Sequence, residues 1–320
     1  MPDSFKITSV GAQPSVKDPR ANRRNGRLRL PQGQWFWKED GRGAPVVFLH
    51  GMPGDSSQWD YVLDSVMERH HDDLHCFVPD LLGCGESLSA VGSSITIQRD
   101  ALLAYLNALD LQQVWLVGTS VGAWVGCDLA IAHPHRVTGL VLLDPDGAIL
   151  PKPLQRQRRR QYRWGRRSLR RQWLGLAKRF SRRATARWHQ VQYLRSHGDQ
   201  FKLWDRLLIK RPKAERQGEW LSGKLEGVKQ PVLLMRSANP DPISGHNYQH
   251  FSRAIAQAKH QPLDALPDSL SATYINSNPN SIPLIDPVNN PPEASAEIAR
   301  HLTQFILSPR DTDAPTTATL

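Results

Sequence analysis

The feature that most constrains this chain is the run Gly-Thr-Ser-Val-Gly at residues 118–122. The apolar residues 114–117 precede it, and the helix-like residues 123–132 follow it. In a strand–turn–helix context, Gly-x-Ser-x-Gly predicts a turn so tight that only small residues fit two positions either side of the serine. Such a turn exposes the Ser120 hydroxyl and directs the next backbone N–H to where an oxyanion would form. Because bare runs of this kind occur by chance, a glycine-rich turn that serves only packing is the alternative.

Three further segments in the first half of the chain follow one another in a regular order. Residues 45–49 form a short apolar run of the kind found in buried parallel strands, and His-Gly-Met-Pro-Gly follows at residues 50–54. A second run, residues 76–80, leads into Leu-Leu-Gly-Cys-Gly-Glu-Ser at residues 81–87. Residues 137–144 predict the strand that follows the turn and helix.

Together these segments resemble the α/β-hydrolase superfamily. Residues 118–122 are similar to its nucleophile turn, residues 50–53 to its His-Gly-x-Pro loop, and residues 80–87 to its Asp-x-x-Gly-x-Gly-x-Ser turn. The resemblance implies an α/β fold: a mostly parallel, doubly wound sheet with an inserted helical cap.

The same resemblance assigns roles to individual residues. It implies that Ser120 is the nucleophile and that the backbone N–H groups of Met52 and Val121 form the oxyanion hole. His50 and Gly51 would then support the oxyanion loop. A serine at this turn argues against haloalkane dehalogenase and epoxide hydrolase chemistry, for which members of the superfamily use an aspartate there.

The resemblance also implies an acidic residue after the strand predicted at residues 231–235. Asp241 lies in the following loop and fits this place, although Ala238 stands where the superfamily has a glycine. An Asx turn, or a cap for the helix that begins near Ser244, is the alternative explanation for Asp241. Asp146, after the preceding strand, is the second candidate because some members of the superfamily carry the acid there.

The histidine base of the superfamily is missing. We expect the last strand at residues 271–275 and the final helix from residue 292, and residues 276–291 between them contain no histidine. A serine hydroxyl without a base is a poor nucleophile, and loss of the base typically costs several orders of magnitude in rate. His246 and His250, on the helix expected after Asp241, are possible bases, although each is more simply explained as a surface histidine.

Positive charge is concentrated in one segment. Between residues 147 and 198 there is no Asp or Glu, and the 16 Lys and Arg residues there exceed the net charge of +11 of the whole chain. Apolar residues recur at helical spacing over residues 169–191, which predicts a cap helix within residues 166–194. Its arginines are either solvated, or they bring residues 152–195 to an anionic membrane or an acidic partner. Nucleic acid is less favoured, because the sequence contains no recognised nucleic-acid module.

These patterns predict an organisation around one core domain. We expect a flexible basic tail at residues 1–26, a core formed by residues 27–146 and 229–307, a cap at residues 147–228 and a disordered end at residues 308–320.

Other features of the sequence bear on compartment and cofactors. Cys76, Cys84 and Cys127 have neither the number nor the spacing of a disulfide or zinc framework. No apolar run reaches the roughly 18 residues of a membrane span, and the first residues lack a secretory signal pattern. We therefore expect a cytoplasmic protein, with peripheral membrane contact as an option. No metal-binding cluster or dinucleotide-binding loop is evident, so no cofactor is expected.

The sequence thus predicts a serine hydrolase or acyl-transfer enzyme with a degenerate triad, acting on a small or medium apolar ester, lactone or amide. Two alternatives remain open. A lyase or isomerase on the same scaffold would use Ser120 for polarisation, and a catalytically inert protein would bind a membrane or a partner.

Overall fold

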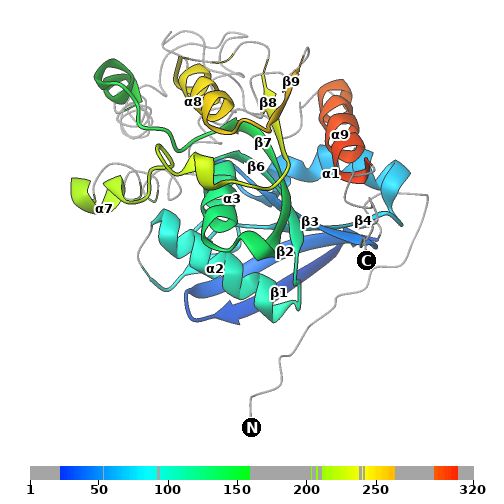
Figure 1. Cartoon of the computed structure of the whole chain (residues 1–320). Helices are drawn as coiled ribbons and strands as arrows, with labels where there is room; N and C mark the ends of the chain where they lie inside the picture. The colour runs from blue at the N-terminus through cyan, green and yellow to red at the C-terminus, as the bar shows by residue number, and fades with distance from the viewer. Residues whose placement is uncertain are drawn as a thin grey trace, which may run out of the picture.

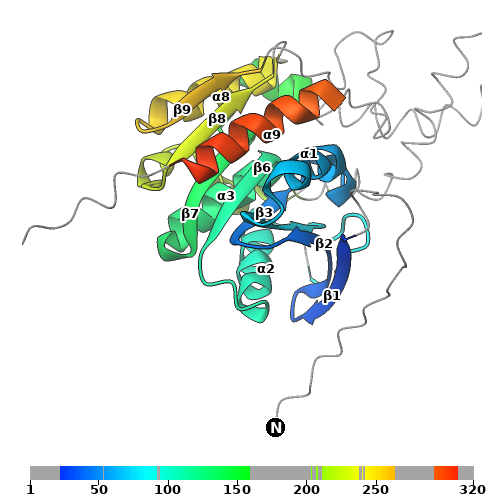
Figure 2. The same cartoon turned by 90° about the vertical axis from the view of Figure 1, so that its right-hand side faces the viewer.

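The computed structural model describes residues 22–52, 54–91, 94–158, 211–237, 242–263 and 292–308, and in addition residues 203, 207 and 240. In this part of the chain a nine-stranded sheet is covered by helices on both faces (Figures 1 and 2). The strands are β1 (Arg24–Leu30), β2 (Gly33–Gly41), β3 (Ala44–Leu49), β4 (Leu74–Pro79), β5 (Leu88–Ser89), β6 (Val114–Ser120), β7 (Val137–Pro145), β8 (Val232–Arg236) and β9 (Lys259–Pro262).

The order of the strands is β1-β2-β4-β3-β6-β7-β8-β9, with β5 paired to β2. Pairing is antiparallel from β1 through β2 to β4, and parallel from β4 to β9. Strand β4 lies on one side of β3 and β6 lies on the other, so the strand order reverses at β3. In open α/β sheets, ligands bind at the carboxyl ends of the strands at such a reversal. The expected fold class, a mostly parallel sheet of the α/β-hydrolase type, is confirmed.

Both faces of the sheet are buried, and alternation along the strands divides the core into two layers. On β7, Leu140 and Leu142 belong to the layer beneath α2, α3 and α8, whereas Val141 and Leu143 belong to the layer beneath α1 and α9. Strands buried on both faces read as continuous apolar runs, which is why these strands were visible in the sequence. The helices are α1 (Asp60–His70), α2 (Ile95–Ala108), α3 (Val121–Ala132), α8 (Pro242–Ala254) and α9 (Pro292–Leu307), and the short ones are α7 (Lys213–Gln217), η1 (Ser56–Trp59), η2 (Pro134–Arg136) and η4 (Leu225–Gly227).

Two edges of the sheet differ from what the sequence predicts. Strand β1 begins at Arg24, inside the segment expected to be a tail, because residues 24–30 pair with β2 over its full length. Strand β9 was not predicted, because Lys-His-Gln-Pro is short and polar, as an edge strand can be. The strand expected at residues 271–275 lies outside the described residues.

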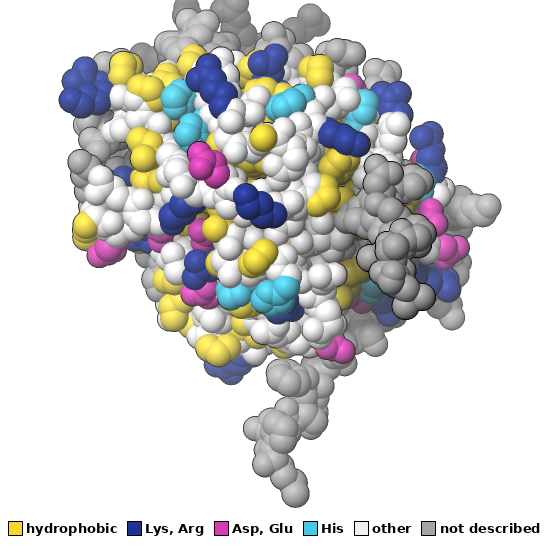
Figure 3. All heavy atoms as spheres, viewed as in Figure 1, with side chains coloured by type: hydrophobic (Ala, Val, Ile, Leu, Met, Phe, Trp, Pro, Cys, Tyr) yellow, Lys and Arg dark blue, Asp and Glu magenta, His cyan; other side chains and the backbone are white. Residues whose placement is uncertain are grey.

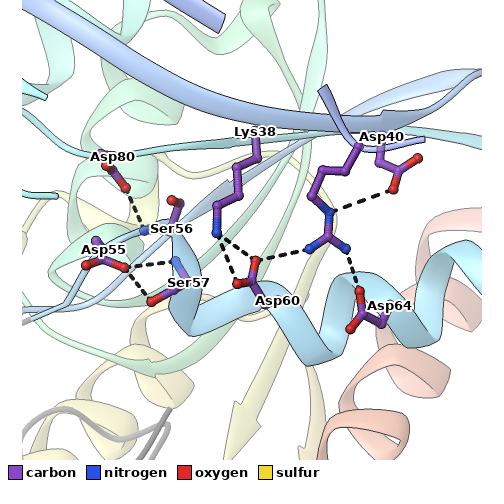
Figure 4. A network of polar contacts seen from close by, with 9 residues as sticks. Lys38, Asp40, Asp55, Ser56, Ser57, Asp60, Asp64 and Asp80 are labelled. Carbon is purple, nitrogen blue, oxygen red and sulfur yellow. Dashed lines mark hydrogen bonds and ion pairs between the residues drawn. The ribbon is translucent and has the colours of Figure 1, made fainter. Parts of the chain in front are cut away.

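A polar network fixes the chain between β2, β4 and the start of α1 (Figure 4). Lys38 on β2 reaches Asp60 on α1 at 2.8 Å, and Arg23 pairs with Asp60 at 3.2 Å and with Asp64 at 2.6 Å. Asp80, directly after β4, accepts a hydrogen bond from the Ser56 N–H at 2.6 Å. These contacts hold the segment that follows β3 against the carboxyl end of the sheet.

The cap is described only in parts. Residues 152–158 are helical, and Leu203 lies against Gly83, because a Cβ on this glycine would lie 2.9 Å from a Leu203 methyl group. The helix expected at residues 166–194 lies outside the described residues, so its proposed contact with membranes stays a prediction. On the face seen in Figure 3, the described Lys and Arg side chains are spread among neutral and acidic ones. None of the helices described is both long and apolar enough to cross a membrane.

Candidate functional site

Ser120 lies between the last residue of β6 and the first of α3, with φ of 50° and ψ of −116°. A residue other than glycine rarely adopts a positive φ, so the backbone at Ser120 is strained. The two glycines of the turn permit it. A Cβ on Gly118 would lie 2.7 Å from Ala123, and one on Gly122 would lie 2.3 Å from the Leu49 carbonyl oxygen. The close packing of β3, β6 and α3 therefore explains the Gly-x-Ser-x-Gly pattern.

The loop after β3 packs directly against Ser120. A Cβ on Gly51 would lie 3.2 Å from the Ser120 Cβ. His50 is buried, and its Nε2 accepts a hydrogen bond of 2.9 Å from the Leu81 N–H. Its Nδ1 must then carry the proton that it donates to the Gly51 carbonyl oxygen at 2.7 Å. Gln58 accepts a hydrogen bond from the Gly51 N–H at 2.8 Å, so both backbone polar groups of Gly51 are held. His50 and Gly51 thus shape the loop, and the His50 ring has no capacity left to act as a base.

Two backbone N–H groups are the expected oxyanion donors. The Val121 N–H belongs to the first turn of α3, where such groups have no partner inside the helix. Met52 follows the held peptide of Gly51, and its side chain is fully buried. Their joint role as an oxyanion hole stays a prediction.

The Ser120 hydroxyl donates a hydrogen bond to a carboxylate, not to an imidazole. Its Oγ lies 3.1 Å from Oδ2 of Asp146, and the Asp146 backbone N–H donates to the Ser120 carbonyl oxygen at 3.1 Å. Asp146 directly follows β7, the neighbour of β6 in the sheet. Ser120 is 1% exposed and Asp146 is 2% exposed, so this contact is shielded from water.

The other oxygen of Asp146 is held by two buried side chains from distant segments. Arg158, in the helical residues 152–158, forms an ion pair with Oδ1 through its Nη2. Asn247 on α8 donates from Nδ2 to the same oxygen at 3.0 Å. The described site is therefore a buried cluster of one hydroxyl, one carboxylate, one guanidinium and one carboxamide.

The predicted acid, Asp241, lies outside the described residues, and the structure does not bring the possible bases, His246 and His250, to Ser120 in the residues that it describes. On α8, Nε2 of His246 lies 3.2 Å from the Ile149 carbonyl oxygen. Burial, followed by the nearby charges of His246 and Arg253, lowers the pKa of His250. The described contacts bring neither histidine to Ser120, so the role of both as bases stays a prediction.

The absence of the superfamily histidine does not depend on which strand is the last. Strand β9 lies at residues 259–262, so the interval between it and the final helix begins earlier than the sequence predicts. No histidine occurs from residue 261 to residue 300, a range that includes both intervals. His260 itself lies on β9, where Nδ1 is 3.2 Å from the Tyr248 hydroxyl.

Sequence reasoning missed two residues of this cluster. Arg158 is one of many arginines in its segment, and nothing in the pattern distinguishes it from its neighbours. Asn247 directly follows His246, which the sequence suggests as a possible base, but no motif indicates a role for the asparagine itself. Only the three-dimensional structure shows that these two side chains converge on Asp146.

Other reactive groups near the sheet are unsuited to nucleophilic chemistry. Burial raises the pKa of the Cys84 thiol well above its usual value, and burial likewise raises that of Cys127. Neither side chain therefore supplies a thiolate at neutral pH. Within the described ranges, no three His, Cys, Asp or Glu side chains lie close enough together to hold a metal ion.

Comparison with known proteins places this geometry in a family. A model of the alpha/beta hydrolase fold matches residues 44–224, more than half of the chain. A haloalkane dehalogenase of Agrobacterium fabrum is 34% identical over 108 residues, which are 33% of this chain and 34% of that protein. A 2-hydroxymuconate semialdehyde hydrolase of Pseudomonas sp. strain CF600 is 33% identical over 116 residues, which are 35% of this chain and 40% of that protein. These matches thus cover well under half the length of either curated relative.

A solved structure extends the likeness of fold over most of the chain. The enol-lactonase of Burkholderia xenovorans superposes with a TM-score of 0.60 at 16% identity, over 88% of this chain and 100% of that chain. Both the order of the strands and the match of residues 44–224 lead to one assignment: this chain belongs to the α/β hydrolase fold family.

Proposed function

We propose that this protein is a serine hydrolase or acyl-transfer enzyme in which Ser120 attacks the carbonyl carbon of an ester, lactone or amide. The observation that carries the proposal is the position of Ser120: a strained turn at the carboxyl end of β6, with its hydroxyl on a buried carboxylate. Strain of this kind costs about 1–3 kcal/mol and persists only where the surrounding structure imposes it. A serine that served only packing would not need this conformation.

The proposed reaction uses Ser120 together with the two expected oxyanion donors. Ser120 Oγ forms a bond to the carbonyl carbon, and the carbonyl oxygen becomes an oxyanion that the N–H groups of Met52 and Val121 stabilise. The leaving alcohol or amine departs when the carbonyl re-forms, and an acyl group remains on Ser120. Water then releases the acyl group as a carboxylic acid, or another alcohol accepts it.

The surroundings of the site favour an apolar acyl group. Trp124 on α3 stacks on Trp220 at a centroid distance of 4.8 Å, and Leu221 lies against Gly147, next to Asp146. These side chains bring aromatic and aliphatic surface close to the charged cluster. The relatives named above act on chemically different substrates by their names, so the family alone leaves the substrate open.

Labelling with a fluorophosphonate probe tests the proposal, because the probe reacts only with an activated serine. We expect a covalent adduct on the peptide that contains Ser120, with loss of fluoride, and no adduct in Ser120→Ala. Ser56→Ala is the matched control: Ser56 is also buried at this end of the sheet, but lies outside the turn, and its loss should leave labelling intact. Absence of any adduct on a folded wild-type protein would reject the proposal.

The two alternatives are outcomes of the same experiment. A lyase or isomerase that uses Ser120 for polarisation would bind carbonyl compounds without forming an acyl-enzyme. An inert protein would neither react with the probe nor turn over substrate. The strained turn at the buried Ser120 would then have no catalytic role. The proposed hydrolase is preferred because the strained turn, the held loop and the buried carboxylate are all present.

A further inference from the structure

We propose that Asp146 accepts the proton of Ser120 directly, in the place where other serine hydrolases use an imidazole. This inference rests on the proposed function, because it concerns the activation of the same serine. Two observations carry it: the Ser120 hydroxyl donates to Asp146 Oδ2 at 3.1 Å, and the sequence has no histidine from residue 261 to residue 300.

The two oxygens of the Asp146 carboxylate have different partners. Oδ1 accepts hydrogen bonds from Arg158 and from Asn247, which lies at 3.0 Å. Oδ2 faces Ser120. With Oδ1 occupied twice by donors, Oδ2 is the oxygen that remains to take a proton. A carboxylate held in this way needs no reorganisation before the transfer.

The orientation of Asn247 is itself fixed, which makes the arrangement specific. Its Oδ1 accepts the Ala148 N–H at 2.9 Å, so the amide cannot turn over without losing this bond. Its Nδ2 donates to Asp146 and also to the Ile243 carbonyl oxygen at 3.1 Å. Asn247 is 1% exposed. Asn247 and Arg158 are therefore positioning residues for Asp146.

The proton and the electrons balance in this scheme. The hydroxyl proton of Ser120 moves to Asp146 Oδ2 as the Oγ electron pair forms the bond to the carbonyl carbon. The protonated Asp146 then gives the proton to the leaving alcohol, whose bond to the carbonyl carbon breaks. In the second half, Asp146 takes a proton from water as that water attacks the acyl group, and returns it to Ser120.

A carboxylate base changes the expected pH dependence. Carboxylic acids have reference pKa values near 4, whereas imidazole has one near 6.5. An enzyme with an imidazole base loses activity as the pH falls below about 6.5, but a carboxylate base stays deprotonated well below that pH. A weaker base also transfers the proton less readily, so the reaction should be slow at every pH.

Other charged and titratable groups near Asp146 belong to three elements. Arg158 contributes a positive charge from the start of the cap. Asp144 on β7 is buried and accepts the Ser237 N–H at 3.3 Å. On α8, His246 contacts the Ile149 carbonyl oxygen, and Tyr248 lies one residue beyond Asn247. Of these, His246 carries an imidazole, so it is the group that the test must separate from Asp146.

The test is the rate of fluorophosphonate labelling of the full-length protein from pH 4.5 to pH 8.5. In the wild type we expect no inflection between pH 6 and pH 7.5. We expect Asp146→Asn to reduce the rate about 100-fold, the usual contribution of a general base. The double variant His246→Ala/His250→Ala should label within about twofold of the wild type, because neither imidazole would take the proton. Asp144→Asn, a matched change at the buried acid near the end of β7, should also keep its labelling.

A second variant covers the case in which Asp146→Asn fails to fold. Neutralising Asp146 removes a buried ion pair with Arg158, and breaking such a pair on one side is destabilising. Asp146→Asn/Arg158→Gln removes both charges, so this variant should fold and should still label about 100-fold more slowly than the wild type.

Three results would overturn the inference while leaving the proposed function intact. The first is labelling of a folded Asp146→Asn protein at the wild-type rate, which would make the hydrogen bond a mere tether for Ser120. The second is a wild-type profile that falls off near pH 6.5, and the third is loss of labelling in the histidine double variant. No labelling of the wild type at any pH would instead reject the proposed function itself.

Discussion

Two buried carboxylates, Asp80 and Asp146, follow the carboxyl ends of two strands, β4 and β7, which β3 and β6 separate in the sheet. The hydrogen-bond partners of the two carboxylates differ. Asp80, after β4, accepts the backbone N–H groups of Ser56 at 2.6 Å and Glu86 at 2.7 Å. Asp146, after β7, accepts hydrogen bonds from the side chains of Ser120, Arg158 and Asn247. A carboxylate that accepts backbone N–H groups shapes loops, whereas the proton transfer proposed for Asp146 needs a carboxylate that side chains hold in place.

The contrast also explains which signals the sequence contains. The Asp80 region is local: its turn and its partners lie within about thirty residues, and their spacing forms a recognisable motif. The partners of Asp146 are scattered from residue 120 to residue 247. A motif can encode the first arrangement, but only the fold assembles the second.

The largest effect on stability is expected from Asp80→Ala. This change removes the acceptor of two backbone N–H groups in a buried place, and each unsatisfied group costs about 1–3 kcal/mol. We expect the free energy of unfolding to fall by about 3 kcal/mol in denaturant titrations. Asp146→Asn/Arg158→Gln should lose less, because Arg158 lies in the helical residues 152–158, whose other side chains are mostly exposed. An equal loss in both variants would remove the distinction between a structural and a chemical carboxylate.

Gly122→Ala should have the next largest effect on stability. This change tests whether the tight turn around Ser120 keeps its hydroxyl next to Asp146. The new methyl group would lie 2.3 Å from the Leu49 carbonyl oxygen, so β3 and α3 must separate. Overpacking of this kind costs about 1–3 kcal/mol. It should also move Ser120 away from Asp146 and slow its labelling.

Gly126→Ala is the matched control for that variant. It lies one turn further along α3, where the new methyl group would meet its nearest neighbours at an ordinary 3.6 Å. Replacement of glycine by alanine inside a helix is then stabilising by about 0.5–1 kcal/mol. Thermal denaturation of the two variants should give shifts of opposite sign, and shifts of the same sign would show that the turn is not as tightly packed as described.

The smallest effect concerns pH and β4, the strand that precedes Asp80. Burial lowers the pKa of His75 on β4, and the nearby Glu39 carboxylate opposes this shift in part. The folded state therefore disfavours the protonated imidazole, and its contribution to stability is lost as the pH falls below the unfolded value of about 6.5. Wild type should lose slightly more stability than His75→Phe between pH 7.5 and pH 5. Parallel curves for the two proteins would show that His75 does not contribute to this pH dependence.

Much of the fold could be predicted from the sequence because its central strands are buried on both faces. The runs at residues 45–49 and 137–144 are continuous apolar segments, and the glycines around Ser120 mark a turn that no other residue type fits. Strand β9 could not be predicted, because a short polar edge strand has no apolar pattern. Arg158 could not be recognised for a related reason: it is buried, but its segment contains so many arginines that nothing in the sequence distinguishes it.

The most direct test of the central claim is mass spectrometry of the intact protein during reaction with p-nitrophenyl butyrate at pH 5.5. At this pH a carboxylate still accepts protons, whereas an unperturbed imidazole is largely protonated. The account predicts a mass increase of one butyryl group, located on the peptide that contains Ser120 and absent from Ser120→Ala. An adduct that forms only near pH 7.5 would contradict the role of Asp146, and an adduct on any other residue would contradict the role of Ser120.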